Sequence, residues 1–137
     1  DYFEAWAEEQ SISLKVQGDT LNIQADKNLI QRALSNLLTN AIRHASPDTV
    51  VTIILESVGN TASITVQNIG SNIAVKHIDR IFDRFYRIDP SRQRRFLNEG
   101  IGLGLSIVKS IIQAHKGSIN VTSIDEVTCF TLILPKE

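Results

Sequence analysis

The chain has 137 residues and a formal net charge of −1, and 42% of its residues are hydrophobic. This length suits one domain with a buried core, and the small charge gives no overall field that favours nucleic acid or a membrane surface. No apolar run approaches the roughly 20 residues that cross a bilayer, and no signal peptide is recognised. The chain begins at Asp1 without a methionine, so we expect a piece of a longer protein. Its single cysteine, Cys129, lies in an apolar strand pattern and is interpreted as a core residue in a reducing compartment.

The N-terminal part predicts a short amphipathic segment followed by two short strands. Residues 1–10 carry Phe3 and Trp6 as apolar anchors. Alternation over residues 13–17 predicts a strand, and the pattern of residues 21–24 predicts a second strand after a turn. The sheet is therefore expected to begin in this part of the chain.

A long helix and a hairpin are predicted next. Asp26 is a favoured N-cap residue, and apolar side chains after it repeat with a 3.6-residue period to about Ala45. Two β-rich runs follow at residues 50–58 and 61–68. The Gly-Asn pair between them predicts a hairpin turn.

The second half of the chain predicts two helices separated by a long loop. Residues 77–82 form a short helix candidate, and residues 86–100 then lose apolar periodicity and concentrate arginine, as long functional or disordered loops do. A strong helix pattern covers residues 103–116, with Gly117 placed as its left-handed C-cap. The last strands are expected at residues 118–123 and 129–134.

These elements predict an α/β (α+β) two-layer sandwich. The sheet is expected to be mixed and mostly antiparallel, with about three helices covering one face. No internal repeat or low-complexity segment appears, so residues 1–137 are expected to form a single domain.

Three glycines at alternate positions, Gly100, Gly102 and Gly104, come directly before the last helix. Glycine permits positive φ and lets other groups approach the backbone, and a helix start presents unpaired N–H groups and the positive end of its dipole. The run therefore predicts an anion site, most simply for phosphate, with a plain turn as the alternative. It matches neither the dinucleotide pattern nor the P-loop.

A polar stripe lies on the long predicted helix. Asn36, Asn40, Arg43 and His44 are spaced i, i+4, i+7 and i+8, so they share one face. Amide oxygens can bind Mg²⁺ together with substrate phosphates, and arginine supplies charge for a phosphate. Asparagine is a mediocre helix former, which favours a metal and phosphate face. An ordinary solvated face is the alternative.

Asn68 is a candidate for reading a base. It alternates with Ile64 and Val66, so its side chain is expected on the same face as theirs. A buried amide needs partners, and its oxygen and NH₂ group complement the amine and ring nitrogen of adenine. Gly70 would provide the turn beside it. The alternative is an asparagine that merely opens a turn.

Four motifs in this order give the chain a clear resemblance. It resembles the catalytic, ATP-binding domain of sensor histidine kinases, in the gyrase/Hsp90/MutL-like ATPase superfamily, whose structure is the Bergerat fold. The resemblance covers nearly the whole chain, and the stretch 82–95 further resembles copper- and silver-responsive sensor kinases. The motifs are the N box at residues 36–44, the G1 box at 68–73, the F box at 82–87 and the G2 box at 100–105.

The resemblance implies ATP and Mg²⁺ as ligands and assigns roles to matching residues. It implies that Asn40 coordinates Mg²⁺ with Asn36 as a possible second ligand. It also implies that Arg43 and His44 approach the phosphates, and that Asn68 reads adenine. Asn36, Asn40 and Arg43 are the implied catalytic residues. The other implied nucleotide-binding residues are Gly70, Ile73, Phe85, Tyr86, Arg87, Gly100, Gly102, Leu103, Gly104, Leu105 and Thr128, with a lid over ATP at about 85–100.

The chain departs from the family pattern in and near the base pocket. Asn68 stands where the G1 box normally begins with aspartate, which removes a charge-assisted contact worth on the order of 1 kcal/mol. Asn72 replaces the second glycine of this box, although asparagine tolerates the left-handed region better than most residues. Glu126 and Val127 replace a glycine pair before Thr128. Metal-sensing kinases commonly carry asparagine at the Asn68 position, so ATP binding is expected to be intact in kind and modest in strength.

The implied reaction is transfer of the γ-phosphate to a histidine rather than hydrolysis. Hydrolases of the superfamily carry a glutamate at the position of Asn36, and asparagine cannot act as a general base. The histidines of this chain, His44, His77 and His115, match no acceptor motif. The acceptor is therefore expected in another domain, with transfer relying on positioning and Mg²⁺. The alternatives are a GHKL-type ATPase, an interaction module impaired in nucleotide binding, and a serine kinase of the anti-sigma type.

The resemblance also implies partners and a location. The expected partners are the protein's own dimerisation and phosphoacceptor domain, in a homodimer, and a cognate response regulator. Nucleic acid is not expected as a partner, and this domain is not expected to contact the membrane directly. It is expected in the cytoplasm, as the catalytic part of a bacterial inner-membrane sensor.

Overall fold

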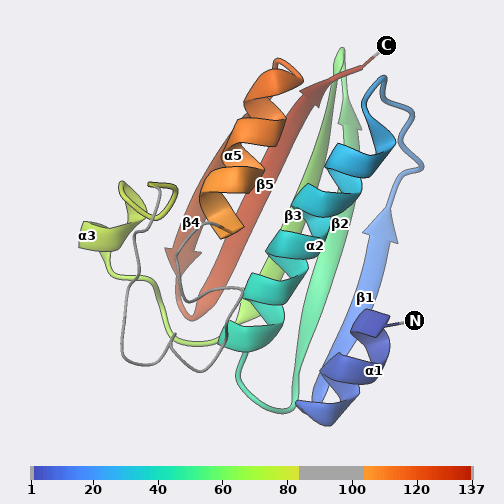
Figure 1. The fold of residues 1–137 in the computed structure, drawn as a ribbon. Helices are drawn as coiled ribbons and strands as arrows, with labels where there is room; N and C mark the ends of the chain where they lie inside the picture. The colour runs from blue at the N-terminus through green and yellow to red at the C-terminus, as the bar shows by residue number, and fades with distance from the viewer. Residues whose placement is uncertain (1, 84–103, 137) are drawn as a thin grey trace.

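A five-stranded sheet forms one layer of the domain (Figure 1). The computed structural model describes residues 2–83 and 104–136. Its strands are β1 (Ile12–Gly18), β2 (Thr49–Val58), β3 (Thr61–Ile69), β4 (Ser118–Ile124) and β5 (Val127–Pro135). They lie in the order β1-β2-β3-β5-β4, with β1 and β2 parallel and the other neighbours antiparallel. The predicted mixed, mostly antiparallel sheet is confirmed.

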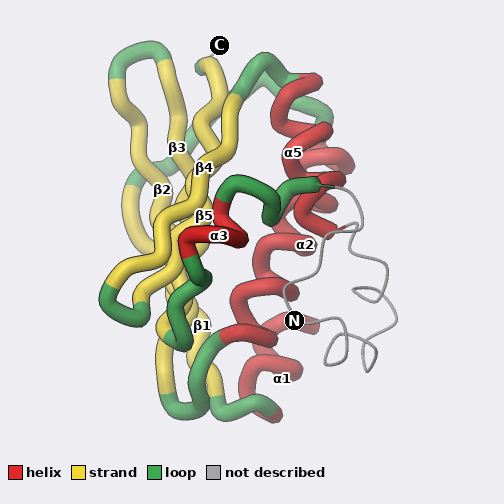
Figure 2. Tube along the Cα trace, turned by 90° about the vertical axis from the view of Figure 1, so that its left-hand side faces the viewer, coloured by secondary structure: helices red, strands yellow, loops and turns green. Residues whose placement is uncertain are grey.

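The helices form the second layer, on one side of the sheet (Figure 2). They are α1 (Tyr2–Glu9), α2 (Lys27–His44), α3 (Val75–Ile78) and α5 (Gly104–Ala114). α2 and α5 lie side by side on the sheet, and α1 packs near β1 (Figures 1 and 2). This arrangement confirms the two-layer sandwich. Among the described residues, no helix is both long and apolar enough to cross a membrane.

An N-cap residue and a repeating apolar pattern define α2. The Asp26 side chain accepts a hydrogen bond from the backbone N–H of Leu29 at 3.0 Å, which confirms the predicted N-cap. At the other end, the backbone N–H of Ala45 donates to the carbonyl of Ala41. The period turns one apolar stripe toward the sheet. The buried residues of α2 are Ile30, Ala33, Leu37, Ala41 and Ile42.

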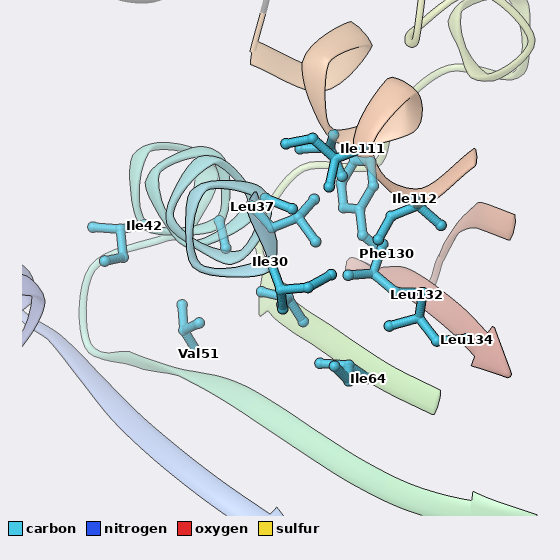
Figure 3. Packing of buried hydrophobic residues seen from close by; sticks show 14 of the residues in the cluster. Ile30, Leu37, Ile42, Val51, Ile64, Ile111, Ile112, Phe130, Leu132 and Leu134 are labelled. Atoms are coloured by element: carbon cyan, nitrogen blue, oxygen red, sulfur yellow. The ribbon is translucent and has the colours of Figure 1, made fainter. Parts of the chain in front are cut away.

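The core lies between the two helices and the sheet (Figure 3). Leu37 of α2 and Ile112 of α5 point toward Phe130 of β5, and all three are almost fully buried. Phe82, the first residue of the F box, packs edge-to-face on Phe130, with ring centroids 6.0 Å apart. The F box therefore begins in contact with the core.

The end of α5 corrects one prediction. Lys116, not Gly117, adopts the left-handed conformation, with φ of 63°. The N–H of Gly117 donates to the Ile112 carbonyl at 2.9 Å, and the N–H of Lys116 donates to the Gln113 carbonyl at 3.0 Å, which is a Schellman motif. Gly117 is needed for space instead, because a Cβ there would meet the carbonyl oxygen of Ile133.

Three other local predictions differ from the structure. The strand predicted at residues 21–24 is wrong, because this segment joins β1 to α2 without pairing to a strand, while Leu21 and Ile23 pack on the core. The helix predicted at residues 77–82 is shorter and begins earlier, because α3 covers only Val75–Ile78 and residues 79–82 form turns. Cys129 is half-buried and not a core residue, because alternation along β5 turns Thr128 and Phe130 toward the helices and Cys129 away from them.

Candidate functional site

A hydrogen bond joins the polar stripe of α2 to the first residue of α5. The side-chain NH₂ of Asn36 donates to the Gly104 carbonyl at 3.3 Å, across 68 positions of sequence. The N-terminal end of α5 therefore lies beside the N box. Among the described residues, no atom outside the immediate backbone lies within 4 Å of a Cβ built at Gly104. The next residue, Leu105, is half-buried against the core.

The other residues of the predicted stripe on α2 do not all face the same part of the site. Asn40 is half-buried and lies one helical turn beyond Asn36 on the same face. Arg43 instead lies against α1, with its guanidinium carbon 5.8 Å from the centroid of the Trp6 ring. His44 is exposed at the end of the helix. The sequence predicted Trp6 as an apolar anchor but did not reveal its contact with a site residue.

Asn68 and Thr128 form a buried polar pair at the end of the sheet. They lie directly opposite each other in β3 and β5, and their exposed fractions are only 2% and 3%. This confirms that Asn68 shares the covered face with Ile64 and Val66. Within the described residues, no hydrogen bond joins the Asn68 amide to another group of the protein. A buried amide that no other described residue pairs with has the hydrogen-bonding capacity that a ligand base would use.

Gly70 brings the end of β3 against the end of α2. A Cβ at Gly70 would meet the backbone carbonyl oxygen of His44, so only glycine fits this approach. The N–H of Ser46 donates to the Ile69 carbonyl at 2.8 Å, which fixes the same junction. Gly70 has no positive φ, so its need is close packing and not the turn conformation suggested by the sequence.

Two departures from the family motifs are partners in the structure. The backbone N–H of Glu126 donates to the Asn72 side-chain oxygen at 2.7 Å, and the Glu126 carbonyl accepts from the N–H of Gly70 at 2.9 Å. Asp125 and Glu126 form the tight turn between β4 and β5, with φ of 52° and 66°. Asn72 therefore ties this turn to the G1 box, which sequence spacing could not show.

The structure adds Ser123, a residue that sequence reasoning missed. Its hydroxyl accepts a hydrogen bond from the backbone N–H of Ile73 at 2.7 Å. The same hydroxyl lies 2.7 Å from that of Thr128. The available signal was the alternation of β4, which puts Ser123 on the covered face with Ile119 and Val121.

Six of the predicted nucleotide-binding residues and the predicted lid at 85–100 lie outside the described residues. The six residues are Phe85, Tyr86, Arg87, Gly100, Gly102 and Leu103. The remaining predicted residues gather around the end of the sheet, the start of α5 and the polar face of α2. Arg43, directed toward α1, is the exception.

The donor set of this site suits a nucleotide. The Asn68 amide and Thr128 hydroxyl can bond a base edge, and the adjacent end of α5 offers N–H groups for phosphate. Among the described residues, no group of three His, Cys, Asp or Glu side chains could hold a metal ion. The amide oxygens of Asn36 and Asn40 fit Mg²⁺, which commonly takes few protein ligands and completes its shell with phosphates and water.

Comparison with known proteins identifies the family of the chain. The profile of the family described as histidine kinase-, DNA gyrase B-, and HSP90-like ATPase matches residues 25–137. The chain therefore belongs to this family of ATPases.

Individual relatives place the chain among the histidine kinases. Sensor histidine kinase CusS of Escherichia coli O157:H7 is 46% identical over 136 residues, which are 99% of this chain and 28% of the relative. The catalytic domain of histidine kinase ThkA has a TM-score of 0.85 and 28% identity, over 98% of this chain and 86% of that structure. ThkA in complex with the response regulator TrrA has a TM-score of 0.80 and 25% identity, over 99% of this chain and 37% of that one. The chain is a histidine kinase catalytic domain, and it spans about 28% of the length of CusS.

Proposed function

We propose that this chain binds Mg-ATP between α2, the start of α5 and the end of the sheet, and donates the γ-phosphate to a histidine on the dimerisation domain of the same protein. The observation that carries the proposal is the Asn68 amide, which is 2% exposed and has no hydrogen bond to another described residue. A folded domain tolerates such a group at a cost of about 1 to 3 kcal/mol. A bound base would supply the missing partners.

The proposed roles divide the site into a base end and a phosphate end. Asn68 and Thr128 bond the base from β3 and β5. Asn40 holds Mg²⁺ through its side-chain oxygen, and Asn36 assists while its NH₂ group fixes the Gly104 carbonyl. When bound, Mg²⁺ reduces the charge of the phosphates and aligns them for transfer. The further proposed nucleotide contacts are Gly70, Ile73, Phe85, Tyr86, Arg87, Gly100, Gly102, Leu103, Gly104 and Leu105.

Arg43 and His44 are proposed to approach the phosphates. The contact of Arg43 with Trp6 means that its guanidinium must leave the ring to do so. A cation–π contact of this kind is worth about 0.5 to 2 kcal/mol. His44 is exposed at the C-terminal end of α2.

Transfer to another group is favoured over hydrolysis by the chemistry of Asn36. Asn36 donates to the Gly104 carbonyl at the start of α5, and it stands at the position where the resemblance places the water-activating glutamate of the hydrolases. An amide has no basic site for a proton from water. The chain therefore positions phosphate for an external acceptor but does not activate water.

The same proposal extends to the whole protein. The similarity to CusS and the resemblance of residues 82–95 support a homodimeric sensor kinase of the inner membrane that responds to copper or silver. This domain would act in the cytoplasm. Its cognate partner would be a response regulator, as in the complex of ThkA with TrrA.

Calorimetric titration tests the nucleotide site. Wild-type chain should bind a non-hydrolysable ATP analogue more tightly with Mg²⁺ than without it, and Asn40→Ala should lose about tenfold or more of the Mg²⁺-dependent gain. Asn28→Ala is the matched control, because Asn28 is an exposed asparagine in the first turn of the same helix. Absence of binding at millimolar nucleotide would contradict the proposal and favour an interaction module. Rapid steady-state phosphate release by the chain alone would favour an ATPase.

A further inference from the structure

Three polar side chains form one cross-strand row at the site end of the sheet. Asn68 of β3 lies opposite Thr128 of β5, and Thr128 lies opposite Ser123 of β4. All three side chains lie on the helix-covered face, in phase with the apolar residues found at every second position of their strands. The next row inward is apolar and consists of Val66, Phe130 and Val121. A polar row at the edge of an apolar core needs a reason, because each buried polar group costs free energy unless it is bonded.

The hydroxyl of Ser123 connects this row to the G1 box. It accepts from the backbone N–H of Ile73 at 2.7 Å, so one lone pair is occupied. Its other partner in the described residues is the Thr128 hydroxyl, also at 2.7 Å. A serine hydroxyl carries a single proton and two lone pairs. Among the described residues, the Thr128 hydroxyl is therefore the only acceptor that remains for the Ser123 proton.

The opposite choice of donor, from Thr128 to Ser123, leaves a hydroxyl proton without an acceptor in the part of the chain that the structure describes. If Thr128 donated to Ser123, the proton of Ser123 would have no acceptor among the described residues, and Thr128 could only accept from a ligand. If Ser123 donates, the one unused proton belongs to Thr128. Thr128 is 3% exposed and is paired with Asn68 across β3 and β5. The Thr128 proton is then available for an acceptor atom of a base bound at the proposed site.

We infer that Ser123 is a positioning residue for the nucleobase: its hydrogen bond to Thr128 makes the Thr128 hydroxyl a donor to a ring nitrogen of the bound purine. Ser123 itself does not touch the base. The inference rests on the proposed nucleotide function, and it adds a residue from β4, outside the four motifs, to base recognition. It also couples recognition to the G1 box, since the same hydroxyl holds the backbone of Ile73.

The experiment compares the affinity of the chain for ATP with its affinities for 1-deaza-, 3-deaza- and 7-deaza-ATP, each of which lacks one ring nitrogen. Calorimetry with Mg²⁺ gives the four affinities for wild type, Ser123→Ala, Ser123→Thr and Thr128→Val. Ser118→Ala is the matched control, because Ser118 is an exposed serine at the far end of the same strand. The ratio of affinities is the decisive readout, because a loss of folding affects all four ligands equally.

We expect wild type to bind one deaza analogue about three- to tenfold less tightly than ATP, the range of one neutral hydrogen bond. This preference should disappear in Thr128→Val and shrink to about twofold or less in Ser123→Ala. It should persist in Ser123→Thr, which keeps the hydroxyl, and in Ser118→Ala. An unchanged ratio in Ser123→Ala, or equal affinity of wild type for all four nucleotides, would overturn the inference while leaving the nucleotide site intact. Failure of wild type to bind any nucleotide would overturn the proposed function and this inference together.

Discussion

Replacement of Asn68 by leucine should stabilise the domain and abolish its nucleotide site at the same time. Leucine has the same branched arrangement of heavy atoms as asparagine, with two bulkier methyl groups in place of the amide oxygen and nitrogen, and position 68 continues the buried apolar face of β3. The substitution removes a buried amide that has no hydrogen bond to another described residue. Replacement of an unsatisfied polar group by an apolar one of similar shape removes its desolvation cost.

The structure gives the size of the expected change. Asn68 is only 2% exposed as a residue, but its amide atoms are not among the described side-chain atoms that are both fully buried and unpaired, so the gain should fall within the range of about 1 to 3 kcal/mol for an unsatisfied group without reaching its upper end. In a domain of this size, that gain corresponds to a rise in melting temperature of roughly 4 to 10 °C. The affinity for ATP should fall by about tenfold or more, because the base then leaves its own donors and acceptors unpaired.

Urea unfolding and calorimetry of the nucleotide-free chain test this prediction. Asn120→Leu is the control, because Asn120 is exposed on β4 and leucine there should change stability by less than about 0.5 kcal/mol. Reduced stability of Asn68→Leu with unchanged ATP affinity would refute the reasoning, since the amide would then be a structural group and not a ligand group.

Two substitutions and one thiol modification have defined outcomes. Asn72→Gly should lower the free energy of unfolding by about 0.5 to 1.5 kcal/mol in urea titrations, because it removes the acceptor of the Glu126 N–H; stability equal to wild type would contradict this. Lys116→Gly should raise the free energy of unfolding by about 1 kcal/mol, and with it the melting temperature, because glycine adopts the left-handed conformation without strain. A lower melting temperature would contradict this prediction. Burial raises the pKa of the Cys129 thiol above its usual range, against the smaller opposing effect of a hydrogen bond with Thr122. Iodoacetamide should therefore modify Cys129 more slowly than free cysteine at pH 8 and faster as the pH rises, and modification as fast as that of free cysteine would be the contrary result.

The parts of the fold that local chemistry determines could be predicted from the sequence. Asp26 and the apolar period defined α2 to within a residue or two, and alternation placed Asn68 on the buried face. These signals depend on neighbours in the chain. The strand predicted at residues 21–24 failed because Leu21 and Ile23 alternate as a strand does, while strand formation also requires a pairing partner that local sequence does not reveal.

The parts of the site that depend on contacts between distant segments could not be predicted. Asn72 and Glu126 are 54 positions apart and each looked like the loss of a glycine, yet together they form one hydrogen bond. Ser123 carries no motif, and its role depends on the register of β4 with β5. The sequence indicated that position 117 requires glycine, but it predicted a left-handed φ as the reason. The reason in the structure is the close approach of the Ile133 carbonyl oxygen.

Transfer of labelled phosphate tests the central claim most directly. The chain is incubated with Mg²⁺ and [γ-³²P]ATP, alone and with the separately prepared histidine-bearing dimerisation domain of the same protein. The account predicts acid-labile label on the added domain, little label on the chain itself, and loss of transfer in Asn40→Ala. ATP binding without any label on the added domain, or phosphate release at the same rate with and without it, would contradict the account.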